Sequence, residues 1–280
     1  MILVAGGCSF IYGSELADAK EFAGFQGYSM KTYPALLAQS MRIDYKSVAY
    51  PGNANNAIAR YVINQCQQLK DNRPMVIVQW SFSNRYEFRF AYSTNHIPSP
   101  WYSVNVWDVS IDKEWLNEGS SDTFKTVDEH ERERMLNHYN NAQKLGITDF
   151  SRSYIKNIAQ TEYWEVYTSL KEIVFLQLFL KANNIPYIFT SADDRLLYNN
   201  TILNMDLTLN SLYSQIDWDN WVKFPSIPDE QLNINYTGGF YQWSQQNNFK
   251  FGCTHPLEDA HTAATKLIQG KFYEMVKKLV

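Results

Sequence analysis

Short apolar runs alternate along this chain with segments of helical periodicity, and this alternation is the strongest constraint on its fold. The clearest run is Met75–Trp80, which is almost continuously apolar and rich in β-branched residues. Such a run is typical of a strand that is buried on both faces of a parallel sheet. Similar strands are predicted at Ile2–Ala5, Tyr45–Tyr50 and Ile185–Thr190.

Between these runs, apolar residues recur at the spacing of a helix. They predict helices that begin near Tyr33, run from Ala57 to about Lys70, cover Glu162–Ala182, and extend from His255-Pro256 to the C terminus. Strands that alternate with helices favour a parallel sheet with helices on both faces. We therefore expect a single α/β domain over residues 1–280, with a flavodoxin-like, three-layer α/β/α architecture and a mainly parallel sheet.

Residues 86–160 interrupt this alternation. They carry many aromatic residues and a charged run, Asp128–Arg134. We interpret the segment as an insertion or lid within the domain, partly helical near 126–143, with the charged run as a solvated helix face. Its aromatic part, 86–115, is expected to shape a substrate cleft.

Composition argues against several classes of function. The net charge of −4 gives no general attraction to nucleic acid. No apolar window reaches the roughly 18 residues of a membrane span, and the N terminus lacks a signal-peptide pattern. The three cysteines are too few for a disulfide framework. We expect cytoplasmic synthesis and no nucleic-acid or membrane partner, and the oligomeric state is open.

Polar residues are predicted to gather near Ser9, which follows the first strand across two glycines. Ligand sites of open α/β folds lie at the carboxyl edge of the strands. Three other polar stretches are expected at the same edge: Pro51–Asn56, Trp80–Arg85 and Thr254–His261. Together they offer a hydroxyl, a glycine that a ligand can approach closely, an amide and an imidazole, which are the groups that acyl transfer needs.

The interpretation assigns a role to each of these groups. Ser9 is the nucleophile and His255 is the base that takes its proton. The backbone N–H groups of Ser9 and Gly52 and the amide of Asn84 would hold the oxyanion. The structural alternatives are a turn or cap at Ser9, a turn at Gly52 and a helix cap at His255.

These stretches resemble the SGNH/GDSL hydrolase superfamily, in a divergent form similar to those of phage and environmental sequences. Gly7–Gly13 resembles the first block, Gly-Asp-Ser-Phe-x-x-Gly, with Cys8 where Asp is usual. Ala49–Asn55 resembles the second block, which supplies the oxyanion glycine, and His255-Pro256 resembles the last. The resemblance implies a serine hydrolase of SGNH type, without a cofactor, that acts on a small-molecule or glycan carboxylic ester, including O-acetyl groups.

The sequence departs from the family pattern at two points. The asparagine of the third block falls on Ser83 or Asn84, and Asn84 is preferred because it can supply an amide donor. The family also places an Asp two or three residues before its histidine, where this chain has Cys253 and Gly252. Other candidates for the group that orients His255 are a backbone carbonyl and the carboxylates of Asp193 and Asp194, which follow a strand.

Further polar residues near these stretches have two interpretations each. Arg85, Glu87 and Asn55 are candidate substrate contacts, but Arg85 and Glu87 also fit an ion pair and Asn55 a helix cap. His261 fits a structural or surface histidine better than a second base.

The cysteines leave two alternatives. Cys8 fits a buried small hydrophobe better than a thiol nucleophile. Cys8, Cys253 and His255 are conceivable metal ligands, but no paired Cys-x-x-Cys spacing supports a metal site, so we expect none.

A second class of function is consistent with the same residues. The missing Asp, the blurred third block and an aromatic content of 15% also fit a catalytically degenerate SGNH-like module that binds glycans or forms part of a virion. Virion association and assembly are therefore open alternatives to an enzyme.

Overall fold

A four-stranded parallel sheet forms the centre of the molecule. The computed structural model describes residues 1–19, 27–89, 101–105, 140, 143–196, 206–232, 234 and 236–279. The strand order is β2-β1-β3-β6 and every pairing is parallel. The strands are β1 Ile2–Gly6, β2 Asp44–Ser47, β3 Pro74–Trp80 and β6 Tyr187–Ser191.

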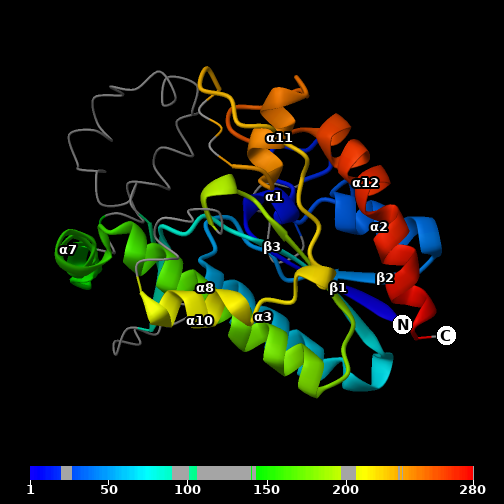
Figure 1. Ribbon diagram of the computed structural model, residues 1–280, viewed down its shortest axis with the longest axis horizontal. Helices are drawn as coiled ribbons and strands as arrows, with labels where there is room; N and C mark the ends of the chain where they lie inside the picture. The colour runs from blue at the N-terminus through cyan, green and yellow to red at the C-terminus, as the bar shows by residue number, and fades with distance from the viewer. Residues whose placement is uncertain are drawn as a thin grey trace.

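Helices cover both faces of this sheet (Figure 1). One face carries α3 Asn55–Gln68, α8 Glu162–Ala182 and α10 Leu207–Ser214. The other face carries α2 Tyr33–Met41, α11 Phe240–Gln246 and α12 Glu258–Lys277. The predicted three-layer α/β/α architecture is therefore confirmed.

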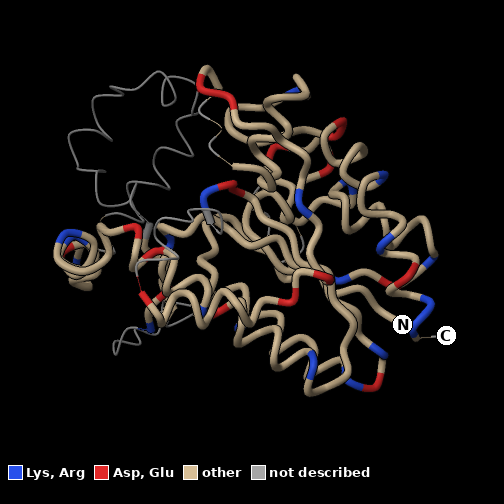
Figure 2. Tube along the Cα trace, viewed as in Figure 1, with Lys and Arg blue, Asp and Glu red and all other residues tan. Residues whose placement is uncertain are grey.

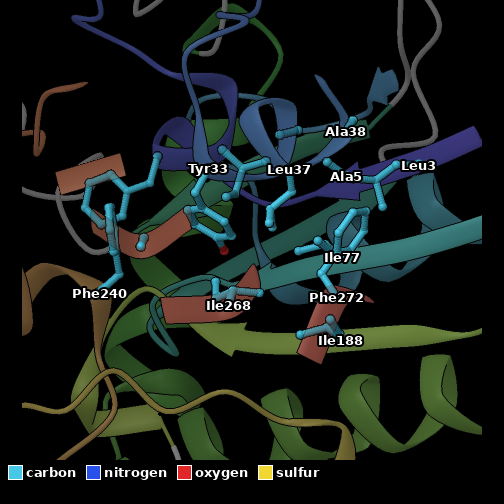
Figure 3. Packing of buried hydrophobic residues seen from close by; sticks show 14 of the residues in the cluster. Leu3, Ala5, Tyr33, Leu37, Ala38, Ile77, Ile188, Phe240, Ile268 and Phe272 are labelled. Carbon is cyan, nitrogen blue, oxygen red and sulfur yellow. The ribbon is translucent and has the colours of Figure 1, made fainter. Parts of the chain in front are cut away.

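Strand β3 shows why the sheet needs a cover on both sides. All seven of its residues are buried. Val76 and Val78 pack in the core cluster that contains α3 and α8, whereas Met75 and Ile77 pack with α2 and α12. Successive side chains of a strand point to opposite faces, so a continuously apolar strand requires two cores. Figure 3 shows the second core, in which α12 contributes Phe272 against the sheet.

The last helix begins later than the sequence predicts. The apolar pattern places its start at His255-Pro256, but α12 begins at Glu258. The backbone N–H of Gly252 donates to the carbonyl of His255 at 3.0 Å, and Phe251 and Pro256 form an isolated bridge. These bonds close a tight loop before the helix, and His255 therefore lies on that loop.

The described part of the predicted insertion contains a hairpin and a helix. Strands β4 Arg85–Arg89 and β5 Trp101–Asn105 pair antiparallel. Helix α7, Ile147–Tyr154, continues into a π-helical segment, Ile155–Ala159. A small core joins hairpin and helix through Tyr86, Val104, Ile155 and Ala159. The charged run and most of the helix predicted near 126–143 lie outside the described residues.

Short helical turns complete the described chain. They are α1 Ser9–Tyr12, η1 Lys70–Asn72, η3 Asp194–Leu196 and η4 Trp218–Asn220. In the central sheet, strands β1, β3 and β6 carry no charged side chain, whereas β2 at the edge carries Asp44 and Lys46 (Figure 2). In the described ranges, no helix combines the length and apolar character needed to cross a membrane.

Candidate active site

Ser9 is the first residue of α1, directly after the carboxyl end of β1. Its carbonyl accepts the N–H groups of Gly13 and Ser14 at 2.8 and 3.0 Å, which close the turn. Its own N–H opens the helix and therefore has no acceptor within it. The residue is buried, and its hydroxyl has no hydrogen-bond partner among the described residues. Both groups are thus left available at the carboxyl edge of the sheet.

The imidazole of His255 is held at one of its two nitrogens. Nδ1 lies 2.6 Å from Oε1 of Glu15 and 2.9 Å from the hydroxyl of Thr254. That hydroxyl donates its proton to the same Glu15 oxygen at 3.1 Å. Nδ1 must therefore be the nitrogen that donates to Glu15, and in the neutral ring Nε2 is then an acceptor.

Phe10 links Ser9 to two other predicted stretches. Its ring meets the ring of His255 edge-on, with 5.2 Å between the centroids. It also contacts the ring of Phe82 at 6.1 Å. Phe10 follows Ser9 directly, and Phe82 lies two residues before Asn84. The structure therefore brings the first, third and last stretches around one aromatic side chain.

The second stretch is tied to the first through the carbonyl of Gly7. This carbonyl accepts the backbone N–H of Tyr50 at 3.3 Å and the side-chain amide of Asn53 at 3.1 Å. Between these two residues the chain turns through Gly52, whose φ of +80° lies in the left-handed region that favours glycine. The loop that carries Gly52 is thereby fixed next to the turn that carries Ser9.

The structure distinguishes Ser83 from Asn84, the two residues that could stand at the asparagine position of the third block. Ser83 is buried, and its hydroxyl donates to Glu165 at 3.1 Å. Burial raises the pKa of this carboxyl, and the Ser83 bond opposes the rise. Asn84 is half-buried, and its amide has no hydrogen-bond partner in the described part of the chain. Asn84 is thus the candidate whose amide remains available.

Glu15 is the functional candidate that sequence reasoning missed. Burial alone would raise its pKa, but the hydrogen bond and charge of His255, together with the bonds from Thr254, outweigh burial and lower it. Glu15 therefore stays ionised at neutral pH. The sequence indicates Glu15 only indirectly. It lacks an Asp at Gly252 and Cys253, where the family resemblance would place one, so the acid must come from elsewhere in the chain.

The structure brings Glu15 to His255 in place of the predicted candidates Asp193 and Asp194. Asp193 accepts from the side-chain amide of Gln242 at 2.6 Å. Asp194 accepts the backbone N–H of Tyr236 at 3.0 Å. Both aspartates follow β6, as predicted, but these bonds fasten the end of that strand to α11 and the loop before it.

Two of the predicted substrate contacts have partners inside the fold. Asn55 accepts the N–H of Ser81 at 2.8 Å and donates to a serine hydroxyl of α8. The Glu87 carboxylate pairs with Arg60 at 2.6 Å, so the ion pair that was one of its two interpretations is formed with Arg60 and not with Arg85. Burial raises the pKa of Glu87, and the bonds from Arg60 counter this rise.

Arg85 remains at the site with a different set of contacts. Its guanidinium donates to the hydroxyl of Ser81 at 2.9 Å and lies 4.7 Å from the ring centroid of Phe82. These contacts hold the cation beside the third stretch, where the sequence predicted a substrate contact.

His261 is a structural histidine in the core. It is buried, and its Nδ1 accepts the backbone N–H of Tyr33 at 3.3 Å. Burial lowers the pKa of His261 to about 3, so the ring is neutral at physiological pH. The expectation of a structural role is met, and the alternative of a surface histidine is wrong.

Cys8 and Cys253 lie in different environments. Cys8 is fully buried in the core that contains α2 and α12, whereas Cys253 is exposed. Among the residues that the structure describes, no group of three His, Cys, Asp or Glu side chains is arranged to hold a metal ion.

Comparisons with known proteins give matches among solved structures alone. No protein-family model matches the sequence, and no curated protein matches it. One similar structure is a GDSL-like lipase from Bacteroides thetaiotaomicron VPI-5482, with 13% identity, coverage of 98% of this chain and 88% of that chain, and a TM-score of 0.41. Another is the psychrotrophic esterase EstA from Pseudoalteromonas sp., with 10% identity, coverage of 99% and 97%, and a TM-score of 0.38.

Proposed function

We propose that this chain hydrolyses carboxylic esters through an acyl-enzyme formed on Ser9. One observation carries the proposal. The ring of His255 is held at Nδ1 and lies edge-on against Phe10, the residue that follows Ser9. This arrangement leaves Nε2 as the nitrogen that would take the hydroxyl proton of Ser9, and a serine paired with such a base is an activated nucleophile.

The reaction follows from these groups in two halves. Oγ of Ser9 attacks the ester carbonyl carbon while Nε2 of His255 takes the hydroxyl proton. The tetrahedral intermediate then collapses, the C–O bond to the alcohol breaks, and the alcohol leaves with the proton from His255. In the second half, a water molecule attacks the acyl carbon while His255 takes a proton from it. The bond between Oγ of Ser9 and the acyl carbon then breaks, His255 returns the proton to Oγ, and the carboxylic acid is released.

The negative oxygen of the tetrahedral intermediate needs donors that are already in position. The N–H of Ser9 at the start of α1, the N–H of Gly52 and the amide of Asn84 are the donors that we propose. The left-handed turn at Gly52 and the unpartnered amide of Asn84 in the described part of the chain support this assignment. A single such donor contributes about 3 kcal/mol to stabilisation of the transition state.

Within the class of carboxylic esters, we propose O-acetyl groups on glycans as substrates. The support is Tyr50, which lies two residues before Gly52 and is 57% exposed. Its ring meets that of Tyr12, the last residue of α1, at 6.1 Å between centroids. An exposed aromatic face beside an ester-cleaving site is suited to hold a sugar ring.

The proposal is tested by turnover of p-nitrophenyl acetate. We expect the unmodified protein to release p-nitrophenol and Ser9→Ala to lose this activity. Ser40→Ala is the matched control, because the hydroxyl of Ser40 bonds to the Leu37 carbonyl of its own helix. Absence of turnover in the unmodified protein, or equal turnover in Ser9→Ala, would contradict the proposal. Retention on an acetylated glycan without turnover would favour a binding module instead.

A further inference from the structure

We infer that Glu15 is the acid of this site, a positioning residue that holds His255 by Nδ1 and balances the charge that the ring gains from the Ser9 proton. The inference rests on the proposed function, and it assigns a residue that the sequence motifs do not indicate. It places the acid six positions after the nucleophile, on the loop that leaves α1.

The carboxylate of Glu15 accepts several hydrogen bonds from the loop that carries His255. Oε1 lies 2.6 Å from Nδ1 of His255 and accepts the Thr254 hydroxyl at 3.1 Å. The backbone N–H of Thr254 lies 3.3 Å from each of the two carboxylate oxygens. These bonds fix the carboxylate and the imidazole in one geometry, which is what an orienting acid must do.

Gly252 provides the space that this carboxylate occupies. A Cβ at position 252 would clash with Oε2 of Glu15 and would lie 3.0 Å from its Cδ. Gly252 also stands at one of the two positions where the family resemblance would place the acid. The chain therefore lacks a side chain at the expected position and supplies a carboxylate to the same place from a distant loop.

The backbone at Glu15 adopts a conformation that needs support. Its φ of 69° lies in the left-handed region, which is uncommon for a residue other than glycine. Such residues persist where the surrounding structure holds them, and they cluster at functional sites. Gly13, with a φ of +81°, caps α1 just before it, and the N–H of Leu16 returns to the Gly13 carbonyl at 3.1 Å.

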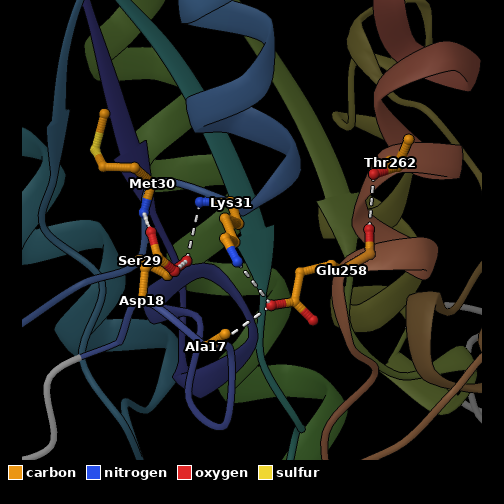
Figure 4. A network of polar contacts seen from close by, with 7 residues as sticks. All are labelled: Ala17, Asp18, Ser29, Met30, Lys31, Glu258 and Thr262. Carbon is orange, nitrogen blue, oxygen red and sulfur yellow. Dashed lines mark hydrogen bonds and ion pairs between the residues drawn. The ribbon is translucent and has the colours of Figure 1, made fainter.

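A network of polar contacts holds the next residues of this loop (Figure 4). The N–H of Ala17 donates to Oε1 of Glu258 at 3.0 Å, and Lys31 pairs with the same oxygen at 3.2 Å. Asp18 accepts the Ser29 hydroxyl and the N–H of Met30. Because Glu258 begins α12, the network joins the Glu15 loop to the element that follows His255.

The charged groups around His255 are few in the described part of the chain. Glu15 is the carboxylate in contact with the ring, and the ring of Phe10 covers one edge. Glu258, with its partner Lys31, lies beyond the Glu15 loop. His261 interacts electrostatically with His255 but stays neutral because burial lowers its pKa. Glu15 is therefore the group in position to balance an imidazolium.

The test compares variants of Glu15 by kinetics and by the ring tautomer. In Glu15→Gln the amide can donate to Nδ1, which would move the ring proton to Nε2 and block the base. We expect kcat to fall by about 10³- to 10⁴-fold, with KM little changed. The ¹⁵N shifts of His255 should change from the Nδ1–H to the Nε2–H tautomer. Glu15→Asp should keep the Nδ1–H tautomer and restore part of kcat.

Glu258→Gln separates this role from simple anchoring of the loop. It weakens the network that holds the same segment but does not touch His255, so the Nδ1–H tautomer should persist. A tautomer that is unchanged in Glu15→Gln would overturn the inference, and so would kcat within threefold of the unmodified protein. If the unmodified protein hydrolyses no ester, the proposed function fails, and the ring tautomer still decides whether Glu15 orients His255.

Discussion

Glu15 Oε1 and His255 Nδ1 lie 2.6 Å apart, although 240 positions separate the two residues in the sequence. One residue lies on the loop after α1 and the other on the loop before α12. The parallel sheet brings these loops to the same edge, which also carries Ser9 at the end of β1. The contact therefore closes a candidate catalytic site from the two ends of the chain.

Substitution of Gly252 tests whether the space for this carboxylate matters. Gly252→Ala would put a methyl group against Oε2 of Glu15, closer than two such atoms can approach, so the carboxylate must move. We expect kcat on p-nitrophenyl acetate to fall by about 10²-fold or more, since displacement of a catalytic group by about 1 Å has this effect. Gly270→Ala in α12 is the control, because a Cβ there meets no atom within 4 Å. Equal activities of the two variants would refute the expectation.

The third stretch can be assigned by a pair of neighbouring substitutions. Asn84→Ala should lower kcat by about 10²- to 10³-fold if its amide holds the oxyanion. Ser83→Ala should leave kcat nearly unchanged and cost about 1 kcal/mol of stability, because it removes one hydrogen bond from the half-buried carboxylate of Glu165. Kinetics of both variants and urea unfolding of Ser83→Ala provide the measurements. The reverse pattern would assign the donor to Ser83.

Tyr50 tests the proposed class of substrate. Tyr50→Ala should lower kcat/KM on an acetylated glycan, followed as released acetate, because the exposed ring is lost. On p-nitrophenyl acetate, which has no sugar, the same variant should keep its activity. Tyr273, on α12 and also exposed, offers a matched control as Tyr273→Ala. A proportional loss on both substrates would count against sugar contact at Tyr50.

His261 predicts how stability responds to acid. Burial lowers its pKa to about 3, whereas an unfolded chain would bind a proton near the ordinary value of 6.5. Below pH 6.5 the unfolded state therefore binds more protons, and the free energy of unfolding falls by an amount on the order of a few kcal/mol towards pH 3. Glu15, whose pKa is lowered in the folded state, reduces the free energy of unfolding further only when the pH falls below the ordinary carboxyl pKa of 4.5.

The variant His261→Asn isolates this contribution. Its Oδ1 can accept the N–H of Tyr33 as Nδ1 does, but it does not titrate. Urea midpoints between pH 8 and pH 4 should fall less steeply in this variant than in the unmodified protein. Parallel slopes for the two proteins would show that His261 does not cause the acid sensitivity.

The sequence predicted the layers of the fold because their signals are local. The buried strand Pro74–Trp80 is almost continuously apolar, and the helix predicted over Glu162–Ala182 has the same bounds in the structure. The start of α12 was misplaced because His255 and Pro256 form a loop through bonds to Gly252 and Phe251. Such bonds leave no mark on the periodicity of the helix that follows.

The candidate site was predictable only where a short motif carries it. Ser9, Gly52 and His255 stand in motifs that could be found along the chain. Glu15 does not, because its partner is distant in sequence and its own loop has no apolar pattern. The position of Asp193 after a strand makes it a candidate, but its hydrogen bond to Gln242 depends on tertiary packing that the sequence does not show. The sequence thus indicates that a carboxylate orients His255, but it does not indicate which carboxylate does so.

Covalent labelling by a fluorophosphonate tests the central claim most directly. The reagent reacts with a serine whose hydroxyl is activated by a base, so the account predicts one adduct per chain. Peptide mass spectrometry should place the adduct on Ser9, and Ser9→Ala should remain unlabelled. An unmodified protein that gives no adduct, or that carries the adduct at another residue, would contradict the assignment of Ser9 as the nucleophile.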